Sequence, residues 1–154
     1  VENVHQLHEE LSDVLVKYVT VKRNNEDLTK AIDIIKEIRE RYQNICLDDK
    51  GTVLNQTYVF ANQFSYMLEI ALVITKGALL RNEFRGAHYK PEFPHRDDEN
   101  WLKTTMASYQ RKEPEISYRP VDLRYLKPIG RDYSKAKKVI PQFENVPTNI
   151  VLPL

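Results

Sequence analysis

Apolar residues recur at helical spacing over the first part of the chain and form two stripes. The first stripe comprises Val4, Leu7, Leu11, Val14, Leu15 and Tyr18. The second stripe comprises Leu28, Ile32, Ile35, Ile38, Tyr42 and Ile45. Because residues three and four positions apart share one face of an α-helix, each stripe predicts an amphipathic helix that buries one side. We expect Asn24 or Asn25 to cap the second helix and the LDDKG segment, with Gly51, to end it.

A third helix is predicted from about Thr57 to Arg81, with Asn55 as its cap. This helix is apolar nearly all round. One face carries Phe60, Phe64, Met67, Leu68, Ala71, Ile74 and Ala78, and the other carries Tyr66, Ile70, Leu72 and Val73. Such a helix needs neighbours on several sides, which the first two helices supply only in part. The third helix therefore either completes a compact three-helix bundle or also faces a partner protein.

The most apolar run of the third helix, residues 66–74, is too short to cross a membrane. Glu69 interrupts the run, and Gln63 and Lys76 flank it. A bilayer span needs about 20 mostly apolar residues. The run predicts a buried core helix, and we expect no direct membrane insertion.

Proline divides the chain into two regions. All 8 prolines follow residue 90, and proline breaks helix interiors. The predicted fold class is therefore mainly α, with a three-helix bundle over residues 1–90 and a loop-rich, proline-containing extension over residues 91–154 that packs on it. Two extended runs, Thr104–Tyr109 and Ile116–Val121, can pair as a short β-hairpin around QRKEPE. The role of residues 139–154 stays unassigned.

Charge and cysteine content narrow the functional classes. The chain has 23 basic and 22 acidic residues, which excludes the basic surplus that general nucleic-acid binding requires. Its one cysteine, Cys46, excludes an internal disulfide and a zinc site of several cysteines, and indicates a reducing compartment. Because Cys46 stands between Ile45 and Leu47, we expect it to fill space in the core. The VENVHQLHEELSDV start has neither an initiator Met nor a leader, and we expect a piece of a longer protein.

Familiar catalytic and cofactor motifs are absent from the sequence. The 4 glycines are isolated, so no G-x-G-x-x-G, P-loop or G-x-S-x-G motif is present. His5 and His8 could face one zinc ion, but no third ligand stands at the sequence spacing of a known zinc site. We therefore expect both to be ordinary surface histidines. We therefore predict no catalytic, cofactor-binding or metal-binding residue in this chain.

Residues 79–106, LLRNEFRGAHYKPEFPHRDDENWLKTTM, concentrate the unusual residues of the chain. On a continuing helix Arg81 and Arg85 would share a face, with Glu83 turned aside. Planar guanidinium groups suit the recognition of carboxylates and carbonyls across an interface, although a solvated charged loop is the simpler alternative. Asp97 or Asp98 is expected to cap a short helix that carries Trp101 inward.

Eight residues of this stretch are our candidates for domain and subunit contacts, and His88 is among them because it follows Gly86, where a helix should end. The candidates are Arg81, Glu83, Arg85, His88, Arg96, Asp97, Asp98 and Trp101. Arg85 and Arg96 would make charge-assisted bonds, and Trp101 would be the packed anchor.

The same stretch resembles a family signature. RNEFRGAHYKPEFPHRDDENWLK is similar to the R-x-E-S-R-G-A-H…D/E-F/Y-P-x-R-D-D-x-x-W-x-K pattern of succinate dehydrogenase and fumarate reductase flavoprotein subunits. IKEIRERYQNICLDDKGTVLNQ upstream and ISYRPVDLRYLKPIGRDYSK downstream extend the similarity over most of residues 5 to 135. One departure is Phe84, where the family usually has Ser, which indicates either different local packing or a subgroup whose neighbouring surface is apolar.

The resemblance implies a C-terminal helical domain of the flavoprotein subunit. That domain would be a scaffold, packed on the flavin domain of the same chain and on the iron–sulfur subunit. The whole quinone-linked subunit would oxidise succinate to fumarate with FAD, on the cytoplasmic face of the inner membrane as a peripheral part of a membrane-anchored complex. FAD and substrate residues lie earlier in such chains, so the fragment alone should be inactive and bind no cofactor.

Two alternatives stay open. L-aspartate oxidase also carries R-E-S-R-G in its helical domain, but has Leu or Cys where Ala87 stands here. The other alternative is a free-standing helical module for protein interaction.

Overall fold

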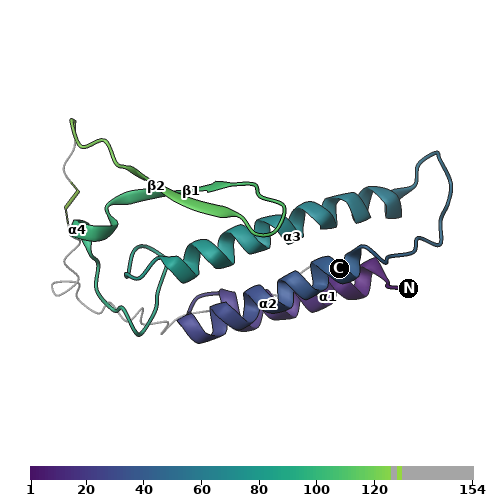
Figure 1. Cartoon of the computed structure of the whole chain (residues 1–154), viewed down its shortest axis with the longest axis horizontal. Coiled ribbons are helices and arrows are strands. Elements are labelled where there is room, and N and C mark those ends of the chain that lie inside the picture. The colour runs from purple at the N-terminus through teal and green to yellow at the C-terminus, as the bar shows by residue number, and fades with distance from the viewer. Residues whose placement is uncertain (126–127, 130–154) are drawn as a thin grey trace, which may run out of the picture. The chain divides into compact units, whose positions relative to one another are not determined.

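Three long helical segments are followed by a short helix and a β-hairpin in the computed structural model of the chain (Figure 1). The elements are α1 (Val4–Val14), the π-helix η1 (Leu15–Val19), α2 (Asn25–Tyr42), α3 (Gln56–Leu80), α4 (Asp98–Trp101), β1 (Lys103–Ser108) and β2 (Glu115–Pro120). The structure describes residues 1–125 and 128–129. All of these elements belong to a unit that spans Val1–Val121, and a second unit begins at Asp122. The predicted mainly α class is confirmed, whereas the expected tail over residues 139–154 lies outside the described residues.

Asparagine side chains begin all three long helices. Asn3 accepts hydrogen bonds from the backbone N–H groups of His5 and Gln6 at the start of α1. Asn24 accepts from the N–H of Asp27 at 2.8 Å, which decides between the two caps expected for α2. Asn55 accepts from the N–H of Tyr58 at 2.8 Å, as predicted for α3. Each cap satisfies N–H groups that have no partner inside the helix.

The two apolar stripes form the core with one face of α3. Buried members are Val4, Leu7, Leu11, Val14, Leu28, Ile32, Ile35, Ile38, Phe64, Leu68, Ala71 and Leu72. Tyr42 closes the end of the core, where its hydroxyl donates to the backbone oxygen of Ala61 at 2.8 Å. The helical periodicity therefore predicted the core residues of α1 and α2 correctly.

The end of α2 differs from the prediction. The helix stops at Tyr42, well before Gly51, and Ile45 pairs with Glu2 in a parallel β-bridge. The N–H of Cys46 donates to the oxygen of Glu2 at 3.1 Å. Neighbouring side chains of an extended segment point to opposite sides, so Ile45 packs on the core while Cys46 is exposed. The expectation of a buried Cys46 is therefore wrong.

Helix α3 is buried on one side only. Leu68, Ala71 and Leu72 lie in the core, but Tyr66 and Ile70 are exposed. The prediction of a buried core helix therefore holds for half of its circumference. By length and composition alone α3 could cross a membrane, a criterion that core helices of other proteins also meet.

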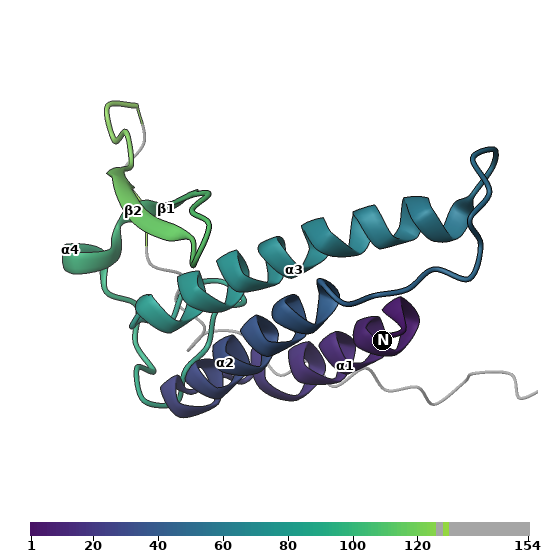
Figure 2. The ribbon, with the colours of Figure 1, turned by 45° about the vertical axis from the view of Figure 1, so that its right-hand side comes forward.

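The predicted hairpin is confirmed with a shift of one residue. Strands β1 and β2 pair antiparallel, from Lys103 opposite Pro120 to Ser108 opposite Glu115. The hairpin lies beside the C-terminal half of α3 (Figures 1 and 2). Its tip is fastened by Glu113, whose carboxylate pairs with Lys36 at 2.6 Å and with Lys76 at 2.9 Å. Ion pairs from two helices thus hold the hairpin on the bundle.

Candidate interface: the arginine corner and the outer face of α3

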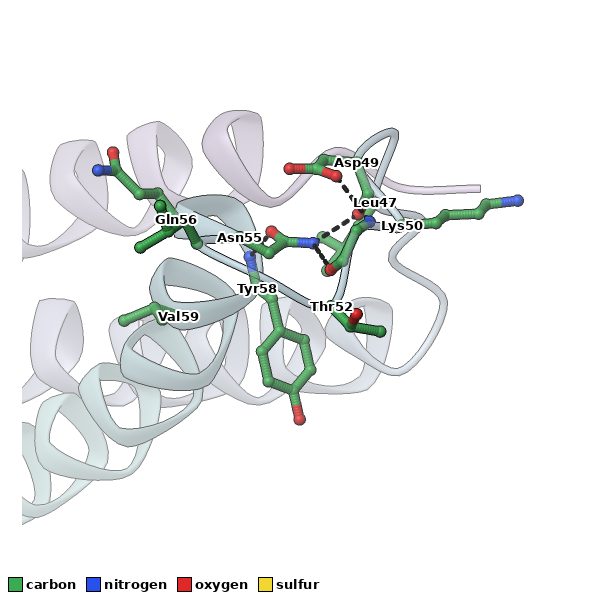
Figure 3. Close-up of a pocket in the computed structure, with 10 residues that line it drawn as sticks. Leu47, Asp49, Lys50, Thr52, Asn55, Gln56, Tyr58 and Val59 are labelled. Carbon is green, nitrogen blue, oxygen red and sulfur yellow. Dashed lines mark hydrogen bonds between the residues drawn. The ribbon is translucent and has the colours of Figure 1, made fainter.

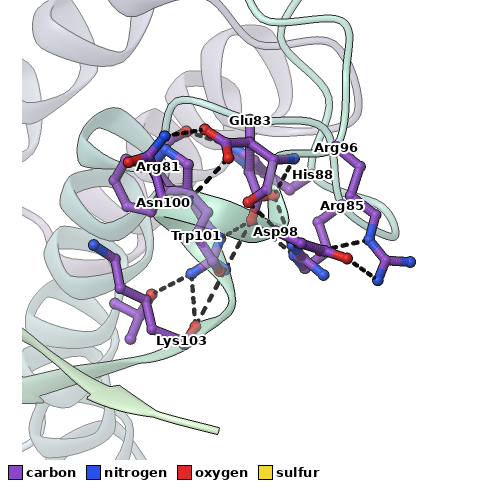
Figure 4. Close-up of polar contacts among 11 residues, drawn as sticks. Arg81, Glu83, Arg85, His88, Arg96, Asp98, Asn100, Trp101 and Lys103 are labelled. Atoms are coloured by element: carbon purple, nitrogen blue, oxygen red, sulfur yellow. Dashed lines mark hydrogen bonds and ion pairs between the residues drawn. The ribbon is translucent and has the colours of Figure 1, made fainter. Parts of the chain in front are cut away.

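The eight interface candidates gather where α3 ends, and we call this cluster the arginine corner (Figure 4, in which all but Asp97 are labelled). Arg81 is the first residue beyond α3, with extended backbone angles. The chain then makes a tight turn in which the backbones of Arg85 and His88 exchange two hydrogen bonds of 3.1 and 3.0 Å. Gly86 has a φ of +59° in this turn, a conformation that glycine adopts without steric cost. Arg81 and Arg85 therefore do not share a helical face, contrary to the sequence expectation.

Glu83 is the centre of the corner. Its side chain is 0% exposed, and its carboxylate accepts from Nε of Arg81 at 2.9 Å and from Nε of Arg85 at 2.8 Å. The backbone N–H of Asp97 donates to its second oxygen at 3.2 Å. Glu83 is therefore turned inward between two guanidinium groups, where its charge is compensated and its oxygens are satisfied. The prediction that it is turned aside is wrong.

A second carboxylate lies on the solvent side of the corner. Asp98 accepts from Nη2 of Arg85 and from Nε of Arg96, each at 2.6 Å. The hydrogen bonds from Arg96, which has the larger effect, and from Arg85 lower the pKa of Asp98 to about 2. Asp97 caps α4 by accepting from the N–H of Asn100 at 2.9 Å, and this bond lowers the pKa of Asp97. Both carboxylates are thus fixed in the ionised form at neutral pH, which disfavours a general-acid role.

Arg81 also connects α3 to the hairpin. Its Nη2 donates to the backbone oxygen of Trp101 at 2.6 Å, and its Nη1 donates to the backbone oxygen of Lys103 at 3.2 Å. The indole ring of Trp101 meets the ring of Tyr118 edge-on at 5.5 Å, and Nζ of Lys103 lies 4.5 Å above the indole. Trp101 is half-buried by neighbours within this chain.

His88 fastens the corner to the start of α2. Its Nδ1 lies 2.9 Å from Nη1 of Arg23, and its Nε2 lies 2.8 Å from the backbone oxygen of Arg81. Since Arg23 can only donate, Nδ1 accepts and Nε2–H donates, which is the arrangement of a neutral imidazole. Burial lowers the pKa of His88, and the nearby charges of Arg23 and Lys90 lower it further against the opposing effect of the bond to Arg81.

Lys90 completes the anchor, although no sequence pattern singled it out. The side chain is buried, and its three N–H groups donate to Oδ1 of Asn25 at 2.7 Å, to the oxygen of Leu79 at 2.8 Å and to Oδ1 of Asn82 at 3.0 Å. Burial lowers the pKa of Lys90 to about 8. Sequence reasoning also missed Arg23. Neither residue stands in a periodic pattern that would have pointed to its partners.

The polar groups of the corner are arranged to hold segments of this chain together. The carboxylates of Glu83 and Asp98 are paired with guanidinium groups, and His88 is held between a cation and a carbonyl. Among the residues that the structure describes, no group of three His, Cys, Asp or Glu side chains could hold a metal ion. His5 and His8 pack on aromatic rings instead, with His5 stacked on Phe60 at 4.8 Å.

A second candidate surface is the outer face of α3, which we define as Val59, Tyr66, Met67, Ile70 and Ile74. Tyr66 is 68% exposed and Ile70 57%. Within Gln56–Leu80, all of which the structure describes, the only charged residues are Glu69 and Lys76. Both turn toward other elements, where Glu69 pairs with Arg39 and Lys76 with Glu113. These five residues are therefore uncharged and mostly apolar, and the exposed Asn62 and Gln63 on the same side of α3 are also uncharged.

Two hollows adjoin this face. One of about 710 Å³ lies beside the start of α3 and is lined by Leu47, Leu54, Tyr58 and Val59, among others (Figure 3). Leu54 has a φ of 55° and is 92% exposed. The other hollow, of about 190 Å³, lies between Ile70 and the hairpin residues Ala107 and Pro114. Apolar hollows beside an exposed apolar face are typical of sites that receive side chains from a partner.

Comparison with known proteins gives the family. Residues 8–133 match the family described as fumarate reductase flavoprotein C-term. The chain is 48% identical over 138 residues to the succinate dehydrogenase flavoprotein subunit of Bacillus subtilis (strain 168), which covers 88% of this chain and 24% of the relative. It is 37% identical over 145 residues to the fumarate reductase flavoprotein subunit of Helicobacter pylori (strain J99), with 91% and 20% covered. The chain thus spans about a quarter or less of the length of these curated relatives.

Solved structures agree with this assignment. E. coli quinol fumarate reductase FrdA superposes with a TM-score of 0.80 at 26% identity, over 84% of this chain and 23% of that one. Mycobacterium smegmatis Sdh1 superposes with a TM-score of 0.67 at 26% identity, over 77% and 20%. The resemblance found in the RGAH and RDD segments is therefore confirmed. This chain belongs to the C-terminal domain family of the succinate dehydrogenase and fumarate reductase flavoprotein subunits.

Proposed function

We propose that this chain is the C-terminal scaffold of a flavoprotein subunit that oxidises succinate to fumarate with FAD. The observation that carries the proposal is the family match over residues 8–133, together with its coverage of only 24% of the B. subtilis relative. In this proposal the reaction takes place in the remaining part of the polypeptide. The domain contributes rigidity and contact surface to it.

The residues that the structure describes do not fit a flavin site. The sequence has no glycine-rich phosphate loop, since its glycines are isolated. Within the described part of the chain, the arginines of the corner, Arg81, Arg85 and Arg96, are engaged with carboxylates or backbone oxygens of this chain. We therefore assign FAD and substrate to other parts of the subunit.

The arginine corner would serve as a preformed contact site for a neighbouring domain or for the iron–sulfur subunit. Its internal ion pairs fix the side chains before any partner arrives, which reduces the entropy lost on binding. Part of the corner stays accessible, since the side chain of Arg85 is 27% exposed and that of Asp98 40% exposed. These partly exposed charged groups suit the polar rim of an interface, where electrostatic complementarity sets orientation.

Partners and location follow from the same proposal. The domain would contact the flavin domain of its own chain and the iron–sulfur subunit. The assembled complex would lie at the cytoplasmic face of the inner membrane as a peripheral part of a membrane-anchored enzyme. The charge balance of 23 basic and 22 acidic residues is consistent with protein partners and gives no support to a nucleic-acid partner.

The experiment is made on the complete protein. Its gene should encode a glycine-rich flavin fingerprint upstream of Val1, and the purified subunit should contain FAD and oxidise succinate with an artificial electron acceptor. Absence of flavin from the complete protein would contradict the proposal. Oxidation of L-aspartate in place of succinate would favour L-aspartate oxidase, whose helical domain the sequence also resembles.

A variant tests the scaffold role separately. Arg85→Ala in the complete subunit should weaken association with the iron–sulfur subunit while FAD is retained, because Arg85 pairs with Asp98 at the accessible edge of the corner. Association is measured by co-purification, with Arg124→Ala as the control in an exposed arginine–aspartate pair, and the thermal midpoint shows whether loss of the bonds from Arg85 to Glu83 unfolds the domain. Intact assembly with lost turnover would make Arg85 catalytic and contradict the scaffold role.

A further inference from the structure

A third hollow lies between α2, α3 and the turn of the β-hairpin, and we call it the hairpin groove. Arg39 and Glu40 line it from α2, Glu69 lines it from α3, and Arg111 and Lys112 line it from the turn. Its volume of about 950 Å³ is within the range of sites that bind small molecules. More charged side chains line this groove than line either hollow beside the outer face of α3. The groove is therefore a candidate site for a charged ligand.

The carboxylates of the groove do not neutralise all of its cations. Glu113 pairs with Lys36 at 2.6 Å and also with Lys76 at 2.9 Å, so a single negative charge faces two positive charges. The hydrogen bonds from Lys36 and Lys76 lower the pKa of Glu113, and its carboxyl group is ionised at neutral pH. Glu69 lies 3.4 Å from Arg39, which is a longer contact than either bond of Glu113. Part of the positive charge on α2 and α3 is thus left for a ligand.

The turn of the hairpin adds two more cations. Arg111 and Lys112 are exposed, and neither makes an ion pair with any residue in the described part of the chain. Five cationic side chains at the groove thus face three carboxylates: Lys36, Arg39, Lys76, Arg111 and Lys112 against Glu40, Glu69 and Glu113. This local excess of positive charge is larger than the net charge of the whole chain, which is +1. The groove therefore concentrates positive charge, which attracts anions.

Two bonds to the backbone of the turn hold the groove in shape. Nη2 of Arg39 donates to the backbone oxygen of Lys112 at 2.5 Å, and Nζ of Lys76 donates to that of Pro114 at 2.7 Å. The side chain of Arg39 is 18% exposed and that of Lys36 32% exposed, so both are recessed, whereas Lys112 is exposed at the rim. Because the recessed cations are already held in place, little conformational entropy is lost when a ligand binds.

We propose that the hairpin groove binds a small anion that carries two or more carboxylate or phosphate groups. One group would meet Arg111 and Lys112 at the rim, and another would meet the recessed Lys36 and Arg39. The guanidinium group of Arg39 has more N–H donors than its bonds to Glu69 and to the turn use, and such donors suit carboxylate and phosphate oxygens. An ion with a single charged group could not engage both the rim and the recessed cations.

A small anion suits the groove better than an acidic segment of a folded protein. A carboxylate on a partner surface would meet Arg111 and Lys112, but the turn, whose backbone is bonded to Arg39, would keep it from the recessed cations. The groove is also separate from the arginine corner, which holds the opposite end of the hairpin through the bond from Arg81 to Lys103 (Figure 1). Binding of an anion there would add a ligand site to the scaffold role of the domain and requires no flavin.

Titration calorimetry on the complete protein tests the proposal, with citrate and pyrophosphate as the probes. We expect at least one of them to bind, and the tighter of the two identifies carboxylate or phosphate as the preferred group. Arg111→Gln combined with Lys112→Gln removes both rim cations and should raise the Kd about tenfold. Lys17→Gln combined with Lys22→Gln removes two exposed lysines that do not line the groove, and this matched control should change the Kd less than about twofold.

Removal of a carboxylate from the groove should have the opposite effect. Glu40 is exposed, lines the groove and makes no ion pair with a residue that the structure describes. Glu40→Gln should therefore lower the Kd about two- to threefold, because it removes a repulsion of the anion without breaking a described ion pair. Glu9→Gln, at an exposed carboxylate of α1 that does not line the groove, is the control and should leave the Kd unchanged.

Three results would overturn the proposal. If neither citrate nor pyrophosphate binds, the groove is only a hydrated, charged surface. If binding is unchanged in Arg111→Gln combined with Lys112→Gln, or in Glu40→Gln, the anion binds elsewhere in the protein. If the rim variant and the lysine control weaken binding equally, the effect comes from the net charge of the protein and not from a site. All the substituted side chains are exposed, so each variant should keep its fold.

Discussion

The side chains of the arginine corner find their interaction partners within this chain, whereas those of the outer face of α3 do not. In the corner, Glu83 is fully buried and accepts hydrogen bonds from both Arg81 and Arg85. On the outer face, Tyr66 and Ile70 are more than half exposed. The corner draws attention in the sequence because it is dense in charge, whereas the outer face consists of residues that are usual in a core.

The difference teaches that charge density alone is weak evidence for a partner. The ion pairs of the corner close on one another and fasten the end of α3, the α4 segment and the hairpin together. Exposed apolar side chains cannot pair with one another in this way, because only contact with another surface removes them from water. An interface role for the corner therefore concerns its accessible edge, whereas an interface role for α3 concerns the whole face.

The largest effect is expected for the centre of the corner. Glu83→Gln removes the buried negative charge between Arg81 and Arg85 and leaves two guanidinium groups without compensation. We expect a loss of about 3 kcal/mol in the free energy of unfolding, the lower end for a broken buried ion pair because both arginines keep some solvent access. The thermal midpoint of the complete subunit measures it. Asp122→Asn, in an exposed pair with Arg124, is the control and should change the midpoint little; equal effects would mean that Glu83 is not structurally central.

The sign of the change in the free energy of unfolding distinguishes a covered outer face from a water-exposed one. Ile70→Gln should lower the free energy of unfolding of the complete subunit by about 1–3 kcal/mol, because docking would bury an amide without a partner. If Ile70 instead faces water, the same change should be neutral or slightly stabilising, since glutamine is the better helix former. Thr29→Gln on the exposed side of α2 should be neutral or stabilising. Thermal midpoints of both variants decide between the two cases.

The anchor of the corner to α2 should depend on pH. Because burial lowers the pKa of His88 below its usual value of 6.5, the unfolded chain takes up a proton at His88 more readily than the folded chain. The stability from neutral His88 is thus complete above pH 6.5 and is lost as pH falls through 6.5 toward the folded-state pKa. Thermal midpoints at pH 7.5 and 5.5 should differ less in His88→Gln than in the unmodified subunit. An unchanged difference would mean that His88 is protonated without cost.

The smallest effect is expected on the exposed side of α2. Lys30 pairs with Glu26 at 2.6 Å, and both side chains are more than half exposed. Solvent and salt screen such pairs, so Lys30→Ala should leave the thermal midpoint of the complete subunit unchanged within error. A shift as large as that of Glu83→Gln would remove the distinction between buried and exposed ion pairs on which the comparison depends.

Local pattern was sufficient for much of the fold. The spacing of Leu28, Ile32, Ile35 and Ile38 placed one side of α2 in the core, and the asparagine caps of α2 and α3 followed from their position before apolar runs. The hairpin and a cap of α4 at Asp97 or Asp98 were also predicted, because alternation and capping depend on neighbours in sequence, and the structure selects Asp97. The resemblance of the RGAH and RDD segments gave the family.

Long-range contacts set the features that the sequence did not predict. Helix α3 stops at Leu80, close to the predicted end at Arg81, but the path of the chain beyond it was not predicted, because it depends on the bonds of Lys90 and His88 to the backbone oxygens of Leu79 and Arg81. That ending turns Glu83 inward between the two arginines. Similarly, Cys46 is exposed because its segment pairs with Glu2, which is distant in the sequence. Neither partner can be inferred from residues nearby in the chain.

The exposed fraction of Ile70 in an experimental structure of the complete flavoprotein subunit tests most directly whether the outer face of α3 contacts another part of the protein. Ile70 is 57% exposed and Tyr66 68% exposed in the domain by itself. We expect both side chains to be buried against the flavin domain, while Glu83 keeps its bonds to Arg81 and Arg85. If Ile70 and Tyr66 are as exposed there as here, the outer face of α3 has no covering partner in its own chain.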